Sequence, residues 1–250
     1  MKYGLIAAGQ GSRLVADGIE TPKPLIRVGG ETLLDRLFRI FCENKAESIS
    51  VIINEEMLQV YDYLMNMKLS VPLNVVVKTT PDSFRSFCEL MPFLQDHQVD
   101  AGAEYGRDGI NHGGKFCLTT IDSIFQESEF ASYVQRFLED ETHDALMGVT
   151  DYIDDEKPLY VKTNPDTLQI SGYANEDYAG SRYISAGIYC MNQRALALLP
   201  AAQEAGVHRM RGFQQYLVDA GLQLQAWPFC KVIDIDHASD IEAANELLTQ

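Results

Sequence analysis

A glycine-rich run near the amino terminus is followed closely by a lysine that stands between two prolines. The run from Leu5 to Leu14 reads LIAAGQGSRL, and the segment from Thr21 to Leu25 reads TPKPL. Small residues let backbone N–H groups approach an anion closely, and Arg13 and Lys23 can supply the charge that holds and polarises the anion. The pattern predicts a loop that binds the phosphates of a nucleoside triphosphate.

Two better-known glycine loops differ from this run. A P-loop requires G-x-x-x-x-G-K-[ST], and no glycine of the run is followed five residues later by Gly-Lys. A dinucleotide-binding fingerprint requires a third glycine at the position of Leu14. It also requires an acidic residue after a second strand, and Asn54 and Glu55 leave that alternative open. A tight turn between a strand and a helix, with no ligand, is the structural alternative.

The run resembles the opening of the sugar-1-phosphate nucleotidyltransferases, which is written roughly L-A-A-G-x-G-[ST]-R-L followed by P-K-P-L. Three later segments are also similar to that family. Thr80 to Phe84 resembles its base-contacting segment, with Ser83 at a position where glycine is usual. Lys115 to Phe125 (KFCLTTIDSIF) resembles its strand that ends in a metal-binding aspartate, and Val232 to Asp236 (VIDID) resembles its C-terminal metal segment. The resemblance covers essentially the whole chain and is strongest at its ends.

The resemblance implies a reaction in which a phosphate oxygen of a sugar 1-phosphate, or a similar phosphomonoester, attacks the α-phosphorus of a nucleoside triphosphate and releases pyrophosphate. Both reactants are anions, so the protein needs cations and a divalent metal more than a general base. Arg13 is expected on the β- and γ-phosphates, and Lys23 on the α-phosphate or between the reactants. The flanking prolines are expected to hold Lys23 in an extended backbone.

The family pattern also assigns residues to the nucleotide and to Mg²⁺. The expected nucleotide-binding residues are Ala7, Ala8, Gly9, Gly11, Ser12, Pro81, Asp82 and Ser83. Asp122 and Asp234 each follow an apolar run and are the expected Mg²⁺ ligands, with Asp236 as a further candidate, because Mg²⁺ takes oxygen ligands and usually only one or two carboxylates. Structural alternatives remain: Asp122 and Asp82 as helix N-caps, and the acids at 234 and 236 as solvent-facing residues of an edge strand.

The acceptor side is less well specified. The family often places a lysine of a Glu-Lys-Pro segment against the sugar phosphate, but here that segment contains Lys157 and comes earlier than expected. Lys157, Lys162 and Arg182 are therefore all candidates for the acceptor phosphate. The segment from Tyr183 to Tyr189 resembles the strand that lines the sugar pocket, so Ser185 and Gly187 are expected to approach the acceptor, although a strand packed for its own sake fits equally well.

Short apolar segments alternate with helical patterns through the first half of the chain, as in a parallel sheet covered on both faces. We expect strands at residues 2–7, 49–53, 73–78, 116–121 and 146–150. Helical spacing is present around residues 33–41 and 84–91, and capping boxes place helix starts at Ser123 and Ser239. Strands at 159–162, 168–171 and 183–191 lack helices between them, so they predict a small antiparallel ribbon beside an acceptor pocket. The expected fold is a Rossmann-like αβα sandwich with a mostly parallel mixed sheet.

Composition narrows the class of protein. The chain of 250 residues is 46% hydrophobic, so one globular domain over 1–250 is expected, with a nucleotide-binding half at 1–150 and an acceptor half with the C-terminal metal segment at 151–250. A net charge of −16 argues against nonspecific nucleic-acid binding. The chain enters a core-like strand at once and has no apolar stretch of membrane length, so we expect neither a signal peptide nor a membrane partner.

The cysteines and one atypical segment complete the pattern. Five cysteines without a C-x-x-C pair do not make a disulfide framework, and Cys117, Cys190 and Cys230 lie in apolar runs, which predicts reduced core residues in a cytoplasmic protein. The stretch 100–114 is acidic and glycine-rich, so it is expected to form a flexible loop or a flap over substrate. The sequence leaves the base, the acceptor and the oligomeric state open. Two other functions are compatible with it: a metal-dependent glycosyltransferase that uses Asp234-x-Asp236, and a catalytically silent regulatory domain.

Overall fold

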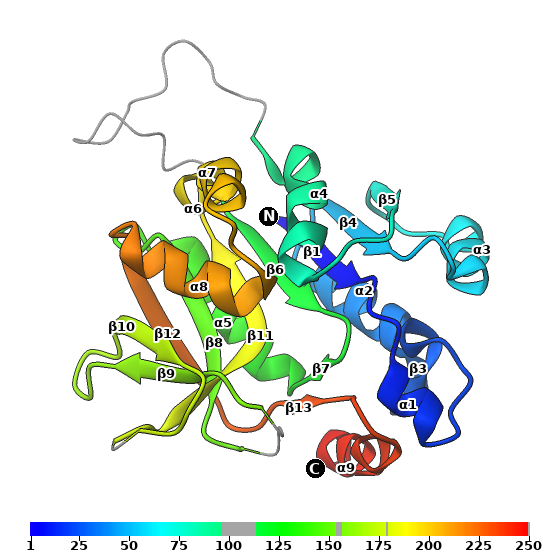
Figure 1. Ribbon diagram of the computed structural model, residues 1–250. Coiled ribbons are helices and arrows are strands. Elements are labelled where there is room, and N and C mark those ends of the chain that lie inside the picture. The colour runs from blue at the N-terminus through cyan, green and yellow to red at the C-terminus, as the bar shows by residue number, and fades with distance from the viewer. Residues whose placement is uncertain (97–113, 154–156, 179, 250) are drawn as a thin grey trace.

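A nine-stranded mixed sheet runs through the protein, and helices cover both of its faces (Figure 1). The computed structural model describes residues 1–96, 114–153, 157–178 and 180–249. The strands are β1 (Lys2–Ala7), β2 (Arg27–Val28), β3 (Glu31–Thr32), β4 (Ser48–Ile53), β5 (Leu73–Val77), β6 (Phe116–Thr120), β7 (Ser123–Ile124), β8 (Ala145–Thr150), β9 (Tyr160–Thr163), β10 (Ile170–Ala174), β11 (Tyr183–Met191), β12 (Leu224–Phe229) and β13 (Ile233–Asp234). The α-helices are α1 (Ser12–Ala16), α2 (Leu33–Glu43), α3 (Leu58–Asn66), α4 (Ser83–Leu94), α5 (Glu127–Glu139), α6 (Gln193–Ala197), α7 (Leu199–Glu204), α8 (Arg209–Asp219) and α9 (Ala238–Leu248).

One half of the sheet is parallel, in the order β6-β1-β4-β5. Side chains alternate between the two faces along these strands: Tyr3 and Leu5 pack into one core, and Ile6 packs into the other. Both faces are buried, which explains why β1 and β4 read as continuous apolar runs rather than as alternating ones. The carboxyl ends of these parallel strands lie at one edge of the sheet, where open α/β sheets bind ligands.

Strand β11 joins the parallel half to an antiparallel half. It pairs with β6 and β9 in different parts of its length, and β8 pairs with it as well. Since Ile184 pairs with both β8 and β9, these two strands lie on opposite sides of β11. The expected ribbon of β9 and β10 is present, but it continues the main sheet through β11 instead of standing apart from it.

The helices form the two outer layers. The core that contains Tyr3 also contains the buried faces of α2, α5 and α9, whereas the core that contains Ile6 includes those of α4 and α8. Figure 1 shows α4 and α8 in front of the sheet and α2 and α5 behind it. Helix α9 lies near α1 at the foot of the view, so an early and a late segment of the sequence lie on one side of the molecule. The three-layer αβα architecture is therefore as the sequence predicts.

Most expected elements are confirmed to within two or three residues, but several local predictions are wrong. Ser123 belongs to β7, and α5 begins later at Glu127, because Ser123 pairs with the C-terminal segment instead of capping a helix. Helix α9 starts at Ala238 rather than after Ser239, and its capping box is formed by His237 and Asp240. Asp82 caps α4, as its structural alternative proposed, by accepting a bond from the backbone of Arg85.

Two further predictions need correction. Lys23 does not lie in extended backbone: Lys23–Leu25 forms a 3₁₀ turn that begins after Pro22, and Pro24 fits inside it because the first residues of such a turn need no intrahelical N–H donor. Cys117 and Cys190 are buried as expected, but Cys230 is exposed, because β12 ends at the preceding residue. The predicted loop at 100–114 lies outside the described residues except for Gly114. Within the described ranges, no helix combines the length and the apolar character that crossing a membrane requires.

Candidate active site

The glycine-rich run forms the connection from β1 to the short helix α1. Gly11 adopts a left-handed conformation, with φ of 63°, and is the N-cap of α1. A left-handed turn at this point favours glycine, because a Cβ atom strains the backbone there. The sequence thus places small residues and then Arg13 directly at the carboxyl end of a central parallel strand.

Lys23 is almost completely buried and is paired with two carboxylates. Its Nζ donates to Asp122 Oδ2 at 2.7 Å and to Asp236 Oδ1 at 2.9 Å. Arg13 donates from Nη1 to the other oxygen of Asp236 at 2.6 Å. The two predicted cations are therefore brought to the same carboxylate, although they come from different segments.

A two-residue antiparallel pairing brings the distant acids to this point. Strand β13 pairs with β7, so that Asp234 lies opposite Ser123, and the N–H of Ile235 donates to the carbonyl of Asp122 at 3.0 Å. Ser123 Oγ donates to Asp234 Oδ1 at 3.0 Å. We call Arg13, Lys23, Asp122, Asp234 and Asp236 the site cluster. The structure brings all five together, whereas the sequence alone could not show that they meet.

The charges in the site cluster do not balance, and the pKa shifts follow from that. Burial disfavours the charge on Lys23, but Asp122 and Asp236 outweigh burial and raise the pKa of its ammonium group. Burial raises the pKa of Asp122, and Lys23 more than offsets this, leaving that pKa below its usual value. For Asp234, burial and the negative charge of Asp122 both raise the pKa, while the hydrogen bond from Ser123 and the charge of Lys23 partly oppose the rise.

The donor set of the site cluster suits Mg²⁺ that is shared with a substrate. Two of its carboxylates, those of Asp122 and Asp234, repel each other when both are charged, and a divalent cation would relieve this repulsion. Among the described residues, no group of three or more His, Cys, Asp or Glu side chains is arranged to hold a metal by protein ligands alone. This arrangement fits an ion that completes its shell with phosphate and water oxygens.

A large cavity opens over the carboxyl ends of the parallel strands. Its volume is about 710 Å³, and its wall includes Arg13, Lys23, Asp122 and Asp236. Of the predicted nucleotide-binding residues, those in the wall are Ala8, Gly9, Gly11, Ser12, Pro81, Asp82 and Ser83. Ala7 is not in the wall, since it is the last residue of β1 and packs into the core.

A second, smaller cavity of about 60 Å³ lies on the other side of the site cluster. Ser185 is in its wall, together with Asp234, and the walls of both cavities include Arg13 and Asp236. Gly187 does not line it but has φ of +72°, and a Cβ atom there would come within 2.7 Å of Ser123 Oγ. The strand β11 can therefore pass close behind the site cluster only with glycine at this position.

The three candidate cations for the acceptor phosphate are not in the wall of either cavity. Lys162 Nζ lies 5.5 Å from the centre of the Tyr178 ring. Arg182 lies against Tyr183 and pairs with Asp151 at 3.8 Å. The backbone carbonyl of Lys157 accepts a bond from Arg211. In the described structure, these three residues lie in and around β9 and β11 and do not contact the site cluster.

The structure adds residues that the sequence did not single out for a role at this site. Asn54, considered there only as part of a dinucleotide site, is in the wall of the large cavity, and so is Arg209. Tyr152 and His237 are in the wall of the small one. Asn54 directly follows β4, so a position after a strand at the ligand-binding edge could have marked it. Nothing near Arg209 in the sequence gives a comparable signal.

Comparison with known proteins decides the family. Residues 4–246 match the family described as nucleotidyl transferase. The chain belongs to the nucleotidyl transferase family. The protein is thus a nucleotidyltransferase, the class of enzyme that the glycine-rich run and the site cluster indicate. No curated protein sequence gives a significant match.

Solved structures of several other proteins share the fold of the whole chain. The inositol-1-phosphate CTP transferase from T. maritima is 22% identical, with a TM-score of 0.77, and the alignment covers 99% of this chain and 94% of that one. A Bacillus anthracis protein assigned as a glucose-1-phosphate thymidylyltransferase, solved with a sucrose, is 17% identical, with a TM-score of 0.78 and the same coverage. HddC from Yersinia pseudotuberculosis, solved with GMP-PN, is 15% identical, with a TM-score of 0.69 and 99% of each chain covered.

Proposed function

We propose that this nucleotidyltransferase transfers a nucleoside monophosphate from a nucleoside triphosphate to a sugar 1-phosphate, or to a related phosphomonoester, in a reaction that depends on Mg²⁺. An oxygen of the acceptor phosphate forms a bond to the α-phosphorus. The bond from that phosphorus to the oxygen bridging to the β-phosphate breaks, and pyrophosphate leaves with the electron pair. The product is a nucleoside diphosphate sugar or its equivalent.

One observation carries this proposal: Arg13 and Asp236 line both the large and the small cavity. A transfer between two phosphates requires two neighbouring sites with a common boundary, where the reacting groups can be held in line. The large cavity has the size and the glycine-rich wall that suit a nucleotide. The small cavity then offers the acceptor phosphate a place next to the α-phosphate.

The two cations have distinct tasks in this proposal. Lys23 is fixed by its 3₁₀ turn and by Asp122 and Asp236, so its ammonium group is aimed before substrate arrives. It would stabilise the charge that develops on the α-phosphoryl oxygens, where a preorganised donor has its largest effect. Arg13 lies further out, on α1, and would hold the β- and γ-phosphates and the leaving pyrophosphate.

Asp122 and Asp234 would hold the metal. When bound, Mg²⁺ would neutralise phosphate charge and orient the triphosphate. The net charge of −16 increases the need for such compensation, because a triphosphate must enter an already anionic protein. Ser123 would keep Asp234 in place through its hydrogen bond of 3.0 Å.

The relatives support the substrate class of the proposal. Their names state a CTP transferase for inositol 1-phosphate and a thymidylyltransferase for glucose 1-phosphate. Both acceptors are phosphomonoesters of a polyhydroxylated ring, so we propose an acceptor of that type. The five cysteines are free thiols, which is consistent with the predicted cytoplasmic location.

The test is a grid of nucleoside triphosphates against phosphomonoesters, with Mg²⁺ present and pyrophosphate detected. We expect at least one pair to release pyrophosphate in amounts equal to the nucleotide product. A variant with Lys23→Met should abolish this release, and Lys78→Met, which removes an exposed lysine paired with Glu89, should not. A folded protein that is silent over a broad grid would contradict the proposal and favour the regulatory alternative. Sugar transfer from a nucleoside diphosphate sugar without pyrophosphate would favour the glycosyltransferase alternative.

A further inference from the structure

The side-chain amide of Asn54 is buried, and the protein satisfies only one of its two polar atoms. Its Oδ1 accepts a hydrogen bond from the N–H of Glu56 at 2.9 Å and another from Thr79 Oγ1 at 3.1 Å. Among the residues that the structure describes, its Nδ2 has no hydrogen-bond partner. In the same residues, the fully enclosed side-chain atoms without a partner are Glu129 Oε2 and Tyr173 Oη, so Nδ2 of Asn54 has a surface that is open to a cavity.

The partners of Oδ1 fix the orientation of this amide. A backbone N–H can only donate, so the side-chain atom that meets the N–H of Glu56 is the oxygen, and the amino group points the other way. The bond to Glu56 closes a local turn, and the bond from Thr79 ties the side chain to the segment after β5. The donor is therefore held in place before a ligand arrives, which lowers the entropy lost on binding.

Asn54 directly follows β4 and is in the wall of the large cavity. It also borders a neighbouring cavity of about 240 Å³, and the walls of both cavities include Gln10, Gly11 and Lys23. The open side of the amide thus faces space beside the glycine-rich loop in either direction. Since Asn54 is only 4% exposed, a donor without a partner here is costly to the protein, and a bound ligand would remove that cost.

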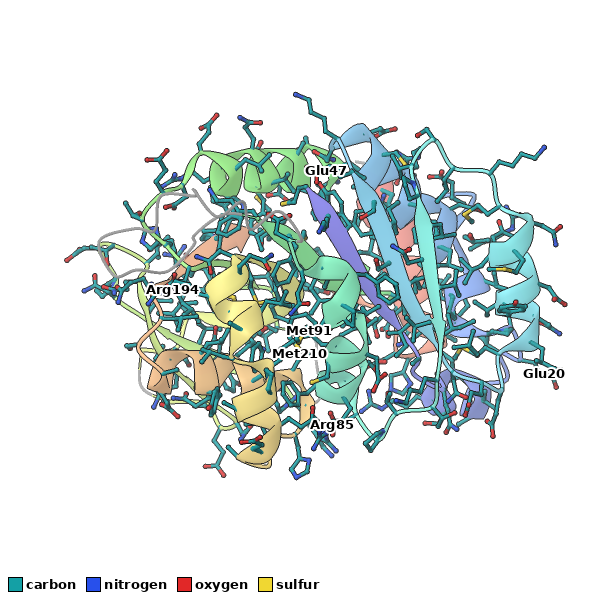
Figure 2. All side chains as sticks on the ribbon, turned by 90° about the horizontal axis from the view of Figure 1, so that it is seen from above. Glu20, Glu47, Arg85, Met91, Arg194 and Met210 are labelled. Atoms are coloured by element: carbon teal, nitrogen blue, oxygen red, sulfur yellow. The ribbon has the colours of Figure 1, made fainter. Side chains whose placement is uncertain are left out.

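The charges in the wall of the large cavity are not spread evenly. Lys23 and its ion-pair partner Asp122 are placed by β6, which lies on the far side of β1 from β4. Asp82 and Arg209, which are also in the wall, belong to the starts of α4 and α8. Figure 2 shows β1, β4 and β5 side by side, running from the end that carries Glu47 toward the end that carries Arg85. The wall residues that follow β4 and β5 are all uncharged: Asn54, Thr79, Thr80 and Pro81.

We propose that Asn54 binds the nucleoside part of the nucleotide, by donating a hydrogen bond from Nδ2 to an uncharged acceptor atom of the ribose or the base. The inference rests on the proposed function only in taking the large cavity as a nucleotide site with the phosphates at Arg13 and Lys23. A nucleoside triphosphate is anionic at its phosphates and uncharged in its ribose and base. It therefore matches the wall when its nucleoside lies along the ends of β4 and β5.

The chemistry of the amide also favours the nucleoside over the phosphates. Phosphate oxygens form their strongest hydrogen bonds with cations, and the site cluster supplies these, whereas a neutral amide suits a neutral acceptor. In dinucleotide-binding sheets, a polar side chain after the strand next to the glycine-rich loop holds a ribose hydroxyl. Asn54 has the corresponding place here, because β4 pairs directly with β1.

The experiment measures binding and needs no acceptor and no turnover. The dissociation constants of GTP, CTP, ATP, UTP, their 2′-deoxy and 3′-deoxy analogues and inorganic tripolyphosphate are determined with Mg²⁺ for the wild type and for Asn54→Ser. Serine is neutral and can still accept the bond from the N–H of Glu56, but it lacks the amide donor. We expect the nucleotides that bind most tightly to lose about three- to tenfold in affinity, and tripolyphosphate to be unchanged.

The analogues identify the acceptor atom. If it is a ribose hydroxyl, the loss should be equal for the four bases and absent for the deoxy analogue that lacks that hydroxyl. If it belongs to the base, the loss should differ among the bases and persist in both deoxy series. Either pattern supports the role of Asn54.

A second variant and a control separate binding from folding. Asn54→Asp keeps the oxygen that accepts from Glu56 and Thr79, so its thermal midpoint should stay near that of the wild type while nucleotides lose more affinity than tripolyphosphate does. The matched control is Asn74→Ser, because Asn74 lies on β5, donates to Ser50 Oγ at 3.2 Å and is in the wall of neither cavity. It should change nucleotide affinity less than about twofold.

The outcomes distinguish this inference from the proposed function. An equal loss for tripolyphosphate and for nucleotides in Asn54→Ser, or no loss at all, would overturn the role of Asn54. If nucleotides bind and Asn54→Ser weakens them selectively, but no acceptor gives pyrophosphate, the proposed reaction fails and the role of Asn54 stands. If the reaction proceeds and Asn54→Ser binds every nucleotide as the wild type does, the reaction stands and the role of Asn54 fails.

Discussion

Two groups of charged side chains lie at opposite ends of the sheet, and they differ in whether the protein itself balances their charges. The site cluster stands at the carboxyl ends of β1 and β6. The other group, which we call the Asp144 cluster, consists of Asp144, Asn192, Arg194 and Gln223, where β8 and β12 begin and β11 ends. Since β8 and β6 are both antiparallel to β11, they run in the same direction, and the beginning of β8 is at the far end of the sheet from the end of β6.

In the Asp144 cluster, the protein itself supplies the hydrogen-bond and ion-pair partners of the carboxylate. Asp144 is buried, and its two oxygens accept bonds from Asn192 Nδ2 at 3.0 Å, from Arg194 Nη1 at 3.0 and 3.2 Å, and from the N–H of Gln223 at 2.9 Å. Asn192 in turn caps α6 through its own side chain. One carboxylate thus joins three elements, and its negative charge has a cationic partner.

The site cluster, in contrast, has three carboxylates and two cations. The raised pKa of Asp234 reflects this imbalance, since its surroundings and Asp122 both disfavour its charge. The comparison teaches that a charge matched within the chain supports the fold, whereas a charge left unmatched awaits a ligand. Four substitutions test this distinction, beginning with the largest expected effect.

Replacing Lys23 by methionine should have the largest effect on activity. The substitution keeps the unbranched apolar stem of the side chain and removes the ammonium group that would contact the α-phosphate. We expect kcat to fall by about a thousandfold or more. Pyrophosphate release by the purified, folded variant measures this effect, with Lys78→Met as the control. A loss of less than about tenfold would show that Lys23 serves the fold and not the reaction.

Replacing Asp144 by alanine should have the largest effect on stability. The change leaves Asn192 and Arg194 without the carboxylate that satisfies them, so the free energy of unfolding should fall by about 3 kcal/mol. For a chain of this size, the thermal midpoint should fall by about 6 to 12 °C. At a temperature where the variant is folded, kcat should stay within about twofold of the wild type. Asp219→Ala, an exposed aspartate on α8, is the matched control and should be neutral. A stable but inactive Asp144→Ala would contradict the assignment.

Replacing Asp234 by asparagine should lower activity without a cost in stability. The amide keeps the acceptor for Ser123 Oγ but removes the charge that Asp122 opposes. We expect kcat to fall by about a hundredfold or more, because the metal loses a carboxylate. Measured without metal, the free energy of unfolding should be unchanged or higher by up to about 1 kcal/mol. A clear loss of stability would mean that Asp234, like Asp144, is matched within the chain.

Replacing Asp140, which lies before β8 near the Asp144 cluster, should have the smallest effect. The loss of stability should depend on pH. Burial raises the pKa of its carboxyl group, but bonds donated by the backbone of Thr142 and by His143 outweigh burial and lower that pKa. A lowered pKa in the folded protein stabilises the fold at pH values above that of the unfolded aspartate, about 4, and this contribution is lost as the pH falls toward the folded pKa.

The variant Asp140→Asn should therefore lose about 1 to 2 kcal/mol of stability at pH 7 and progressively less below pH 4. Denaturant unfolding of both proteins at a series of pH values measures the difference. Glu139→Gln, in the same last turn of α5, serves as a control whose effect should be small. A difference that stays constant from pH 7 to pH 3.5 would show that the charge of Asp140 is unimportant.

The parallel half of the fold and its site could be predicted from the sequence because the signals there are local. An apolar run, glycines and a cation follow one another within a single strand and its loop, so β1, Gly11 and Arg13 are marked together. The metal-binding candidates each follow a strand and could be named from the family pattern. Their convergence could not be derived, since it depends on the pairing of β7 with β13, which joins only two residues on each side.

The acceptor side could not be predicted in this way, because its sequence signals are not local. A lysine or arginine in a loop carries no local signal for the direction of its side chain, so the candidates at 157, 162 and 182 could be named but not placed. Arg209 was missed as a residue of the cavity wall because its place there depends on the packing of α8 against α4 and on a backbone conformation that no arginine prefers on its own. The wrong helix starts near Ser123 and Ser239 have a similar cause, because tertiary pairing and a stronger cap override a correct local motif.

The short pairing of β7 with β13 also has a consequence for how the protein is made. Ser123 and Asp234, which it joins, are 111 positions apart, so the second partner is made long after the first. A ribosome that has released the glycine-rich loop and most of the sheet has still not released Asp234 or Asp236. Catalytic output would thus begin only after the chain has been released past Asp236, so turnover by a nascent or truncated chain would report that β13 has docked.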